Sequence, residues 1–410
     1  MTLAKDYTEM KDSGIDIIGK IPTHWNLCRL RFLCRITTGN QDTQNAVEDG
    51  IYPFYVRSPK IERANSYTFD GESVLMAGDG AGAGKVFHHA FGKYAIHQRV
   101  YCFFDFKNIV PRYFYYFVSN LFSSEIDKGS AKSTVASVRL PMLQNFILCL
   151  PTTKEQTYIA TYLDTQCAKI DEIIAQAKAS IEDYKQWKVS IIHKAVTKGM
   201  GNNRPMKDSG ILWIKKIPES WSVRKLKFAI FPLERPVLNT DEVITCFRDG
   251  EVTLRKNRRT DGFTVSFTEH GYQGVEKGDL VVHGMDAFAG AIGCSDCRGK
   301  TTPVVHVCKT IGNNRYFMYA LRNMALSNVF TDFSNGVRIR SSDFRNFSKL
   351  GDFLIAIPPI TEQGEIVDYL DSMTSKIDML VTEKQRLLDE MESYKKSLIY
   401  EVVTGKRRVC

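Results

Sequence analysis

The chain has 410 residues, of which 43% are hydrophobic and 25% charged, so it can bury ordinary cores, and its length favours two or more domains. It contains no apolar run near the ~20 residues that a membrane-spanning helix needs, and its polar start lacks the apolar stretch of a signal peptide. We therefore expect a cytoplasmic protein with no membrane partner. The formal charge of +9 suits a polyanion such as nucleic acid, although many basic proteins bind none.

Two blocks of the chain each occur twice. Met10 to Phe32 (MKDSGIDIIGKIPTHWNLCRLRF) returns as Met206 to Phe228 (MKDSGILWIKKIPESWSVRKLKF) without a gap. A second block, PTTKEQTYIATYLDTQCAKIDEI from Pro151, returns as PPITEQGEIVDYLDSMTSKIDML from Pro358. The chain therefore consists of two half-molecules in tandem, which predicts a target with two related halves.

Between these blocks, residues 33–150 and 229–356 have the pattern of compact α/β or β-rich domains. Short apolar runs, such as SVLMA at Ser73–Ala77 and GDLVVH at Gly278–His283, alternate with Gly-rich turns, as strands do. Each domain also has one stretch with apolar residues at helical spacing, Val110–Phe122 and Tyr316–Val329. The two stretches occupy equivalent places in the two halves.

One Gly-rich turn, GDGAGAGK at Gly78–Lys85, looks superficially like a phosphate-binding loop. It is not a Walker A motif, because Asp79 stands where the first glycine is required and Lys85 is followed by valine. A dinucleotide site would need a helix next, yet the following VFHHAF continues as a strand. The other half has a comparable turn at Gly284–Gly293, so a tight turn at equivalent places explains both.

Residues 155–197 contain no proline or glycine, and apolar residues recur every seven positions from Leu163 through Ile170 and Ala177. This pattern predicts a long helix with a coiled-coil seam. Residues 365–404 carry the matching pattern, with Lys384 as one break. Each apolar face must be covered, either by the other helix or by its own domain. We favour the first arrangement, in which the helices pair antiparallel and hold the globular domains at opposite ends.

The ten cysteines are scattered and suit reduced core residues better than a disulfide framework. Cys294 and Cys297 form a CxxC, with His306 and Cys308 following on an expected strand. A zinc site is one interpretation of this group, but the second cysteine pair of the usual zinc motifs is missing. We therefore favour a structural role for these residues and predict no metal.

The SGI…IP…W motif at Ser13–Trp25 and Ser209–Trp221, and the P…EQ…I…YLD…KID motif at Pro151–Asp171 and Pro358–Asp378, resemble the specificity subunit of a type I restriction-modification system. The resemblance covers nearly the whole chain. It implies an α/β (α+β) fold of two globular target recognition domains in a pseudo-two-fold arrangement, separated by two long antiparallel coiled-coil helices. The implied segments are a first recognition domain at 1–150, a first spacer helix at 151–200, a second recognition domain at 201–356 and a second spacer helix at 357–410.

The resemblance also implies function and partners. Each recognition domain would bind one half of a bipartite target in double-stranded DNA, while the helices set the gap and dock two modification (methyltransferase) subunits. Restriction subunits, which are ATP-dependent nucleases and translocases, would complete the complex. S-adenosylmethionine, ATP and Mg would then bind the partner subunits, with no cofactor and no catalytic residue in this chain. The chain also lacks the Asp/Asn-Pro-Pro-aromatic tetrapeptide of amino-methyltransferases.

No base-reading residue can be transferred from such variable domains, so candidates for DNA contact rest on charge and hydrogen-bonding geometry. Arginine and lysine neutralise phosphates, and arginine can also bind guanine with two hydrogen bonds. The strongest patch is LRKNRRTD at Leu254–Asp261. The candidates are Arg57, Lys60, Arg63, Lys85 and Arg99 in the first domain, and Arg255, Lys256, Arg258, Arg259, Arg338 and Arg340 in the second.

Two other classes of function remain as alternatives. A coiled-coil adaptor with two protein-binding domains is the first, and an enzyme acting alone is the second. A gel-shift assay with competitor DNA, done with and without modification subunits, separates a DNA-reading subunit from an adaptor.

Overall fold

The computed structural model describes residues 7–124, 137–201, 203–258, 270–332 and 344–409. These form two compact units, residues 1–178 with 385–410 and residues 179–384, here called the first and second unit. The division falls inside both long helices, α4 (Thr153–Lys198) and α8 (Ile360–Val403). The four segments expected from the sequence, with boundaries at 150, 200 and 356, stay a prediction.

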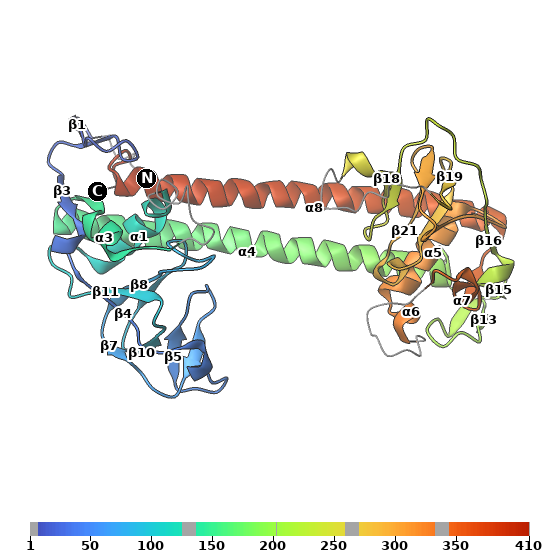
Figure 1. Cartoon of the computed structure of the whole chain (residues 1–410), viewed down its shortest axis with the longest axis horizontal. Helices are drawn as coiled ribbons and strands as arrows, with labels where there is room; N and C mark the ends of the chain where they lie inside the picture. Colours follow the sequence, from blue (N-terminus) through green and yellow to red (C-terminus); the bar gives the residue numbers. More distant parts are fainter. Residues whose placement is uncertain (1–6, 125–136, 202, 259–269, 333–343, 410) are drawn as a thin grey trace. The chain divides into compact units, whose positions relative to one another are not determined.

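The first unit contains two four-stranded sheets. Several of their strands, among them β4, β8 and β11 of one sheet and β5, β7 and β10 of the other, are labelled in Figure 1. One sheet has the order β4-β11-β8-β9 and is antiparallel throughout, and the other has the order β6-β5-β10-β7 with β5 and β10 parallel. The elements before α4 are β1 Met10–Asp12, β2 Lys20–Pro22, β3 Asn26–Arg29, β4 Arg35–Thr38, β5 Tyr52–Tyr55, β6 Glu62–Ala64, β7 Phe69–Asp70, β8 Ser73–Ala77, β9 Phe87–Ala90, β10 Lys93–Ile96, β11 Val100–Phe104, α1 Pro111–Leu121, α3 Leu140–Asn145 and β12 Ile147–Leu150.

The second unit repeats the main sheet of the first unit, whereas its other strands form two two-stranded sheets, β17-β18 and β19-β22. Its four-stranded sheet has the order β16-β23-β20-β21, the counterpart of β4-β11-β8-β9, and helix α5 packs on β20 and β21 as α1 packs on β8 and β9. The elements are β13 Met206–Asp208, β14 Lys216–Pro218, β15 Ser222–Lys225, β16 Ile230–Pro232, β17 Ile244–Cys246, β18 Val252–Leu254, β19 Gln273–Val275, β20 Leu280–His283, β21 Ile292–Cys294, β22 Gly299–Thr301, β23 Val305–Thr310, α5 Asn314–Leu326, α6 Val329–Asp332, α7 Phe347–Gly351 and β24 Leu354–Ile357.

Each unit has one main hydrophobic core, built on a tryptophan from the first repeated block. In the first unit, fully buried Trp25 shares its core with Leu163 near the start of α4 and Val402 near the end of α8. In the second unit, Trp221 lies in a core with Val196 near the end of α4 and Leu370 near the start of α8. Both helices therefore supply core residues to both units.

Helix α4 begins where the sequence expects and has an identifiable cap. Thr152 Oγ1 accepts from the Glu155 backbone N–H at 3.3 Å, and Glu155 accepts from the Thr152 N–H at 3.0 Å, which is a capping box. Both helices end before a glycine with positive φ, +71° at Gly199 and +72° at Gly405.

The two helices pack antiparallel, as the heptad pattern predicts. In the first unit, Asp171 of α4 pairs with Lys395 of α8, and Lys178 pairs with Glu392, so residue numbers rise along one helix as they fall along the other. In the second unit, Lys188 of α4 pairs with Asp378 of α8. Among the described residues no helix is long and apolar enough to cross a membrane.

Candidate nucleic-acid interface

The repeated YLD motif ties each globular domain to a long helix. Asp164 of α4 accepts hydrogen bonds from Arg112 Nε and the Tyr116 hydroxyl of α1, each at 2.7 Å. Burial raises the pKa of the Tyr116 hydroxyl, so it stays a donor. The globular domain is thereby fixed on its helix by a charged contact as well as by apolar packing.

The second unit makes the same contact. Asp371 of α8 accepts from Arg315 and from the Tyr319 hydroxyl, the latter at 2.7 Å. Burial raises the pKa of Tyr319 to about 12. The aspartate of the motif thus recurs because its partners on α1 and α5 recur.

The glutamine of the EQ motif has a comparable role. Gln156 accepts from the Val110 N–H at 2.7 Å and donates to the Pro151 carbonyl at 3.0 Å. Gln363 accepts from the Asn313 N–H at 2.9 Å and donates to the Pro358 carbonyl at 3.0 Å. Each amide therefore joins the entry of a long helix to the start of α1 or α5.

The DSGI sequence of the first block forms the same turn twice. Ser13 Oγ accepts from the Ile15 N–H at 3.2 Å, and Ser209 Oγ accepts from the Ile211 N–H at 3.0 Å. The glycine between serine and isoleucine has positive φ in both copies, +69° at Gly14 and +67° at Gly210. L side chains rarely adopt this conformation.

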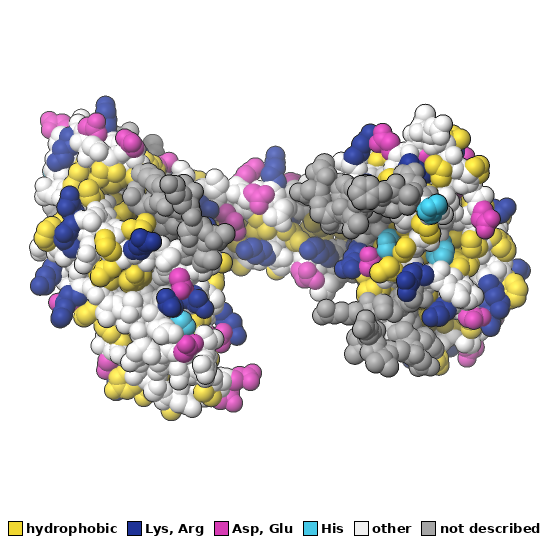
Figure 2. All heavy atoms as spheres, in the orientation of Figure 1, with side chains coloured by type: hydrophobic (Ala, Val, Ile, Leu, Met, Phe, Trp, Pro, Cys, Tyr) yellow, Lys and Arg dark blue, Asp and Glu magenta, His cyan; other side chains and the backbone are white. Residues whose placement is uncertain are grey.

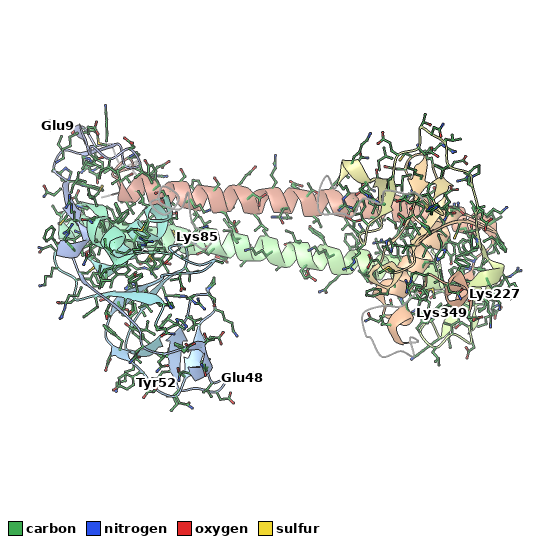
Figure 3. All side chains as sticks on the ribbon, viewed as in Figure 1. Glu9, Glu48, Tyr52, Lys85, Lys227 and Lys349 are labelled. Atoms are coloured by element: carbon green, nitrogen blue, oxygen red, sulfur yellow. The ribbon has the colours of Figure 1, made fainter. Side chains whose placement is uncertain are left out.

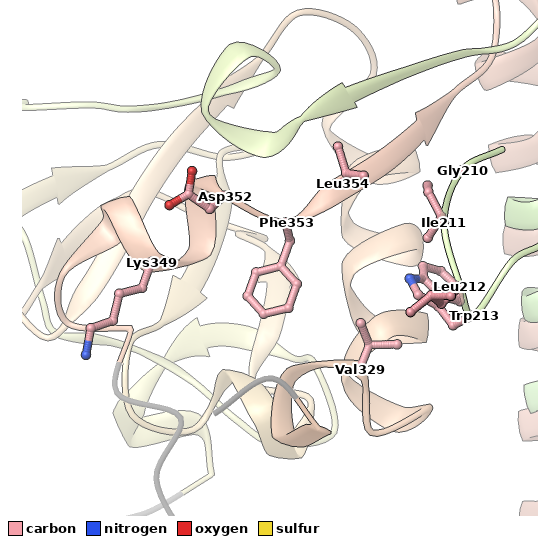
Figure 4. A pocket seen from close by; sticks show the side chains of 9 residues that line it. All are labelled: Gly210, Ile211, Leu212, Trp213, Val329, Lys349, Asp352, Phe353 and Leu354. Atoms are coloured by element: carbon pink, nitrogen blue, oxygen red, sulfur yellow. The ribbon is translucent and has the colours of Figure 1, made fainter. Parts of the chain in front are cut away.

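Each of these turns borders an apolar pocket of similar size. In the first unit a pocket of about 430 Å³ is lined by residues that include Ile15, Ile17 and Phe146. In the second unit the pocket measures about 420 Å³ and is lined by residues that include Trp213 and Phe353 (Figure 4). The repeat therefore duplicates a surface feature as well as a fold.

The glycines at the start of the two Gly-rich turns both lie in close backbone packing. The Gly78 N–H donates to the Arg99 carbonyl at 2.8 Å, and a Cβ on Gly78 would lie 3.0 Å from that oxygen. The Gly284 N–H donates to the Val304 carbonyl at 2.8 Å, and a Cβ there would lie 2.7 Å from that oxygen. The prediction of tight turns at equivalent places is confirmed.

The structure brings together some of the basic residues predicted for the first domain. Arg57 Nη1 lies 3.0 Å from Asp79 Oδ1, and Arg99 Nε lies 3.7 Å from Asp79 Oδ2. Lys85 is exposed at the end of the same turn (Figure 3). Three candidates therefore gather around residues 78–85.

The other two candidates of the first domain lie on the β5–β6 hairpin. Lys60 Nζ lies 3.3 Å from Glu62. Arg63 donates to the carbonyls of Gly50 and Ile51 at 2.6 and 2.9 Å, so its guanidinium already holds a loop in place.

The basic run of the second domain is largely paired within the protein. Lys256 Nζ lies 2.6 Å from Glu242, and Arg258 Nη1 lies 2.6 Å from Asp249 and 2.9 Å from Glu251. Hydrogen bonding to Asp249 raises the pKa of Arg258.

Two further contacts bear on this run. The Arg258 guanidinium stacks on Phe247 at 4.4 Å, and Arg255 Nε donates to Thr245 Oγ1 at 3.2 Å. The β17–β18 hairpin thus places carboxylates and an aromatic ring beside this segment. The sequence alone predicts an unpaired basic patch there. Arg259, Arg338 and Arg340 lie outside the described residues.

One arginine outside the predicted set, Arg248, forms an exposed ion pair in the second domain. Arg248 Nη2 lies 2.9 Å from Asp286 Oδ1, and its side chain is 67% exposed. It stands alone in the sequence, 38 residues from its partner, so no local pattern marks it. Figure 2 shows basic and acidic side chains interspersed on the drawn face, so charge density alone does not locate an interface.

The cysteine group does not form a metal site in the described part of the chain. Cys294 and Cys308 pack with the main core of the second unit, whereas Cys297 packs with a separate cluster around Val252. Burial raises the pKa of Cys294 and of Cys308 to about 12, which opposes the thiolate that zinc needs. His306 Nε2 lies 2.7 Å from the Phe344 carbonyl oxygen. The described residues hold no group of three metal-ligating side chains.

Comparisons with known proteins agree on one family. Residues 22–183 match the family described as type I restriction modification DNA specificity domain. The chain is 23% identical over 419 residues to the type I restriction enzyme EcoDI specificity subunit of Escherichia coli, covering 95% of this chain and 90% of that protein. It is 24% identical over 421 residues to the type I restriction enzyme MjaVIII specificity subunit of Methanocaldococcus jannaschii, covering 95% and 94%.

A solved structure shares the fold. A chain from work on complex assembly and conformational transition of the type I R-M system superposes with a TM-score of 0.66 at 13% identity, covering 93% of this chain and 98% of that chain.

Proposed function

We propose that this chain is the specificity subunit of a type I restriction-modification system: it supplies the DNA sequence specificity of the complex and is not itself the catalytic subunit. Its partners are DNA and the other subunits of the restriction-modification system. The observation that carries the proposal is the matching order of the main sheets in the two recognition domains, β4-β11-β8-β9 and β16-β23-β20-β21. Two domains of one architecture with different surfaces suit a protein that reads two half-sites of different sequence.

In this proposal each recognition domain binds one half of a bipartite target. Basic side chains neutralise phosphates and so give affinity that depends on salt, while hydrogen bonds to base edges give specificity. The first-domain candidates around residues 78–85 are the best placed, since Arg57 and Arg99 share the single carboxylate of Asp79 and the exposed Lys85 ends the same turn. Arg258 and Lys256 contribute less, because nearby carboxylates offset their charge.

We further propose two modification subunits per chain. An identical partner in two copies needs the same docking surface twice, and the repeat supplies two similar pockets of about 430 and 420 Å³ beside the two DSGI turns. The long helices provide the rest of the docking surface. S-adenosylmethionine, ATP and Mg would bind the modification and restriction subunits. The complex would act in the cytoplasm, where its DNA substrate lies.

Methylome sequencing tests the proposal. Cells that express this chain with its modification partner should carry methyladenine at a bipartite motif, and the purified chain alone should neither methylate DNA nor hydrolyse ATP. Exchanging residues 33–150 for those of a related protein should change one half of the motif and leave the other. Robust methyl transfer by the isolated chain, or no motif with the partner present, contradicts the proposal. The adaptor alternative has no comparable support.

A further inference from the structure

Arg57 and Arg248 occupy equivalent positions in the two recognition domains. Arg57 lies two residues after the end of β5 at Tyr55, and Arg248 lies two residues after the end of the matching strand β17 at Cys246. Each forms an ion pair with the aspartate of the Gly-rich turn that follows the central strand, Asp79 after β8 and Asp286 after β20.

The backbone around each pair is equivalent as well. A Cβ on Gly82 would collide with the Arg57 carbonyl oxygen, and a Cβ on Gly290 would lie 2.8 Å from the Arg248 carbonyl oxygen. A glycine later in each turn thus lets the turn pack directly on the arginine-bearing segment. Two domains whose sequences otherwise diverge have kept this contact, so it is more than an accidental surface ion pair.

The geometry favours contact with a base rather than with a phosphate. In each pair one Nη atom faces the carboxylate, at 3.0 Å for Arg57 and 2.9 Å for Arg248, while the side chains remain 45% and 67% exposed. A carboxylate offsets the positive charge that a phosphate contact depends on, but it also fixes the plane of the guanidinium fork. A fixed fork matches the two acceptors, O6 and N7, on the major-groove edge of guanine.

We propose that Arg57 buttressed by Asp79 and Arg248 buttressed by Asp286 each read a guanine, one in each half-site. The inference rests on the proposed function. It predicts that both halves of the target contain a guanine, and that each guanine is read through the domain that carries the arginine.

The test uses the complete chain with its modification partner. Arg248→Lys keeps the charge but removes the fork, so methylome sequencing should show relaxed selectivity at a single guanine of one half-site, by roughly tenfold to a hundredfold, with the other half unchanged. Arg57→Lys should do the same in the opposite half. Arg224→Lys, an exposed arginine on β15, serves as the control and should leave the motif as in the wild type. Because both test side chains are exposed, unchanged thermal unfolding should accompany these results.

Three other outcomes distinguish failure of this inference from failure of the proposed function. A uniform loss of methylation at all sites, restored in low salt, assigns the arginines to phosphates and overturns the inference. If both variants methylate the same motif as the wild type, the inference is also overturned. The proposed function stands in that case, because the motif of the wild type is still bipartite. Absence of a bipartite motif in the wild type contradicts the proposed function instead.

Discussion

Lys188 Nζ lies 2.7 Å from both carboxylate oxygens of Asp378, which joins the end of α4 to the start of α8 in the second unit. Lys395 makes the same contact with Asp171 in the first unit, at 2.6 Å. Each helix therefore supplies the lysine in one unit and the aspartate in the other. This reciprocity explains why the KID motif occurs twice, because its aspartate is the acceptor in both pairs.

These ion pairs should add modestly to stability. Their side chains are 29% to 60% exposed, so we expect Lys188→Met to lower the free energy of unfolding by less than about 1 kcal/mol. Urea denaturation of Lys188→Met, Asp378→Asn and the double variant measures the coupling. The control is Arg386→Met, since that side chain is 75% exposed. A coupling energy above about 2 kcal/mol would contradict this account of a solvent-screened pair.

The aspartate of the YLD motif should matter more. Asp164→Asn keeps the shape but weakens the acceptor for Arg112 and for the largely buried Tyr116 hydroxyl, so the free energy of unfolding should fall by about 1–3 kcal/mol. Asp371→Asn should behave alike through Arg315 and Tyr319.

Asp183→Asn is the matched control for these two variants, because Asp183 is exposed on α4. Thermal unfolding should show no comparable loss for it. If all three variants have equal midpoints, the YLD aspartates do not hold the domains to the helices.

Acid should weaken the first unit more than the second. Burial lowers the pKa of His88, His89 and His97 in the first unit, whereas His283 is the described histidine so affected in the second. A histidine whose folded pKa lies below its unfolded value of 6.5 favours the unfolded chain as pH falls through 6.5. Stability is therefore greatest above that pH and declines below it.

Hydrogen exchange from pH 7.5 to 5.0 measures this effect within each unit. Protection of β8 and β11 should fall more steeply than protection of β20 and β23. His88→Gln removes one titrating group and should flatten the decline in the first unit. Equal slopes in both units would rule out the buried histidines as the cause.

The long helices and the tandem repeat could be predicted from the sequence because periodicity and repetition are local signals. The absence of proline and glycine from 155 to 197 marks α4 to within two residues of its bounds, Thr153 and Lys198. The Arg248–Asp286 pair could not be predicted, since it depends on the approach of two turns far apart in the chain.

The pairing of the basic run at 254–261 could not be predicted for the same reason. The β17–β18 hairpin brings three carboxylates next to this run, where they offset the charges of Lys256 and Arg258. These carboxylates belong to Glu242, Asp249 and Glu251. The sequence shows which residues carry a charge, but the fold decides which of those charges form ion pairs.

The two long helices should act as a spacer between the half-sites. An insertion between Lys194 and Ala195, near the end of α4, would disrupt the main core of the second unit, because Ala195 and Val196 are buried in it. The division between the units, after Lys178 in α4 and after Lys384 in α8, avoids it. Four residues added at both places lengthen each helix by ~6 Å and about one turn, which nearly preserves the facing direction.

At ~3.4 Å per base pair, this insertion should lengthen the gap in the methylated motif by one or two base pairs and leave both half-sites unchanged. The matched control inserts four residues in α4 alone. That change shifts α4 against α8, so the pairs Asp171–Lys395 and Lys188–Asp378 cannot both form in the native register, and the unfolding midpoint should drop. Methylome sequencing of the double insertion measures the gap between the half-sites. Altered half-site bases at the old gap length would mean that the helices do not set this gap.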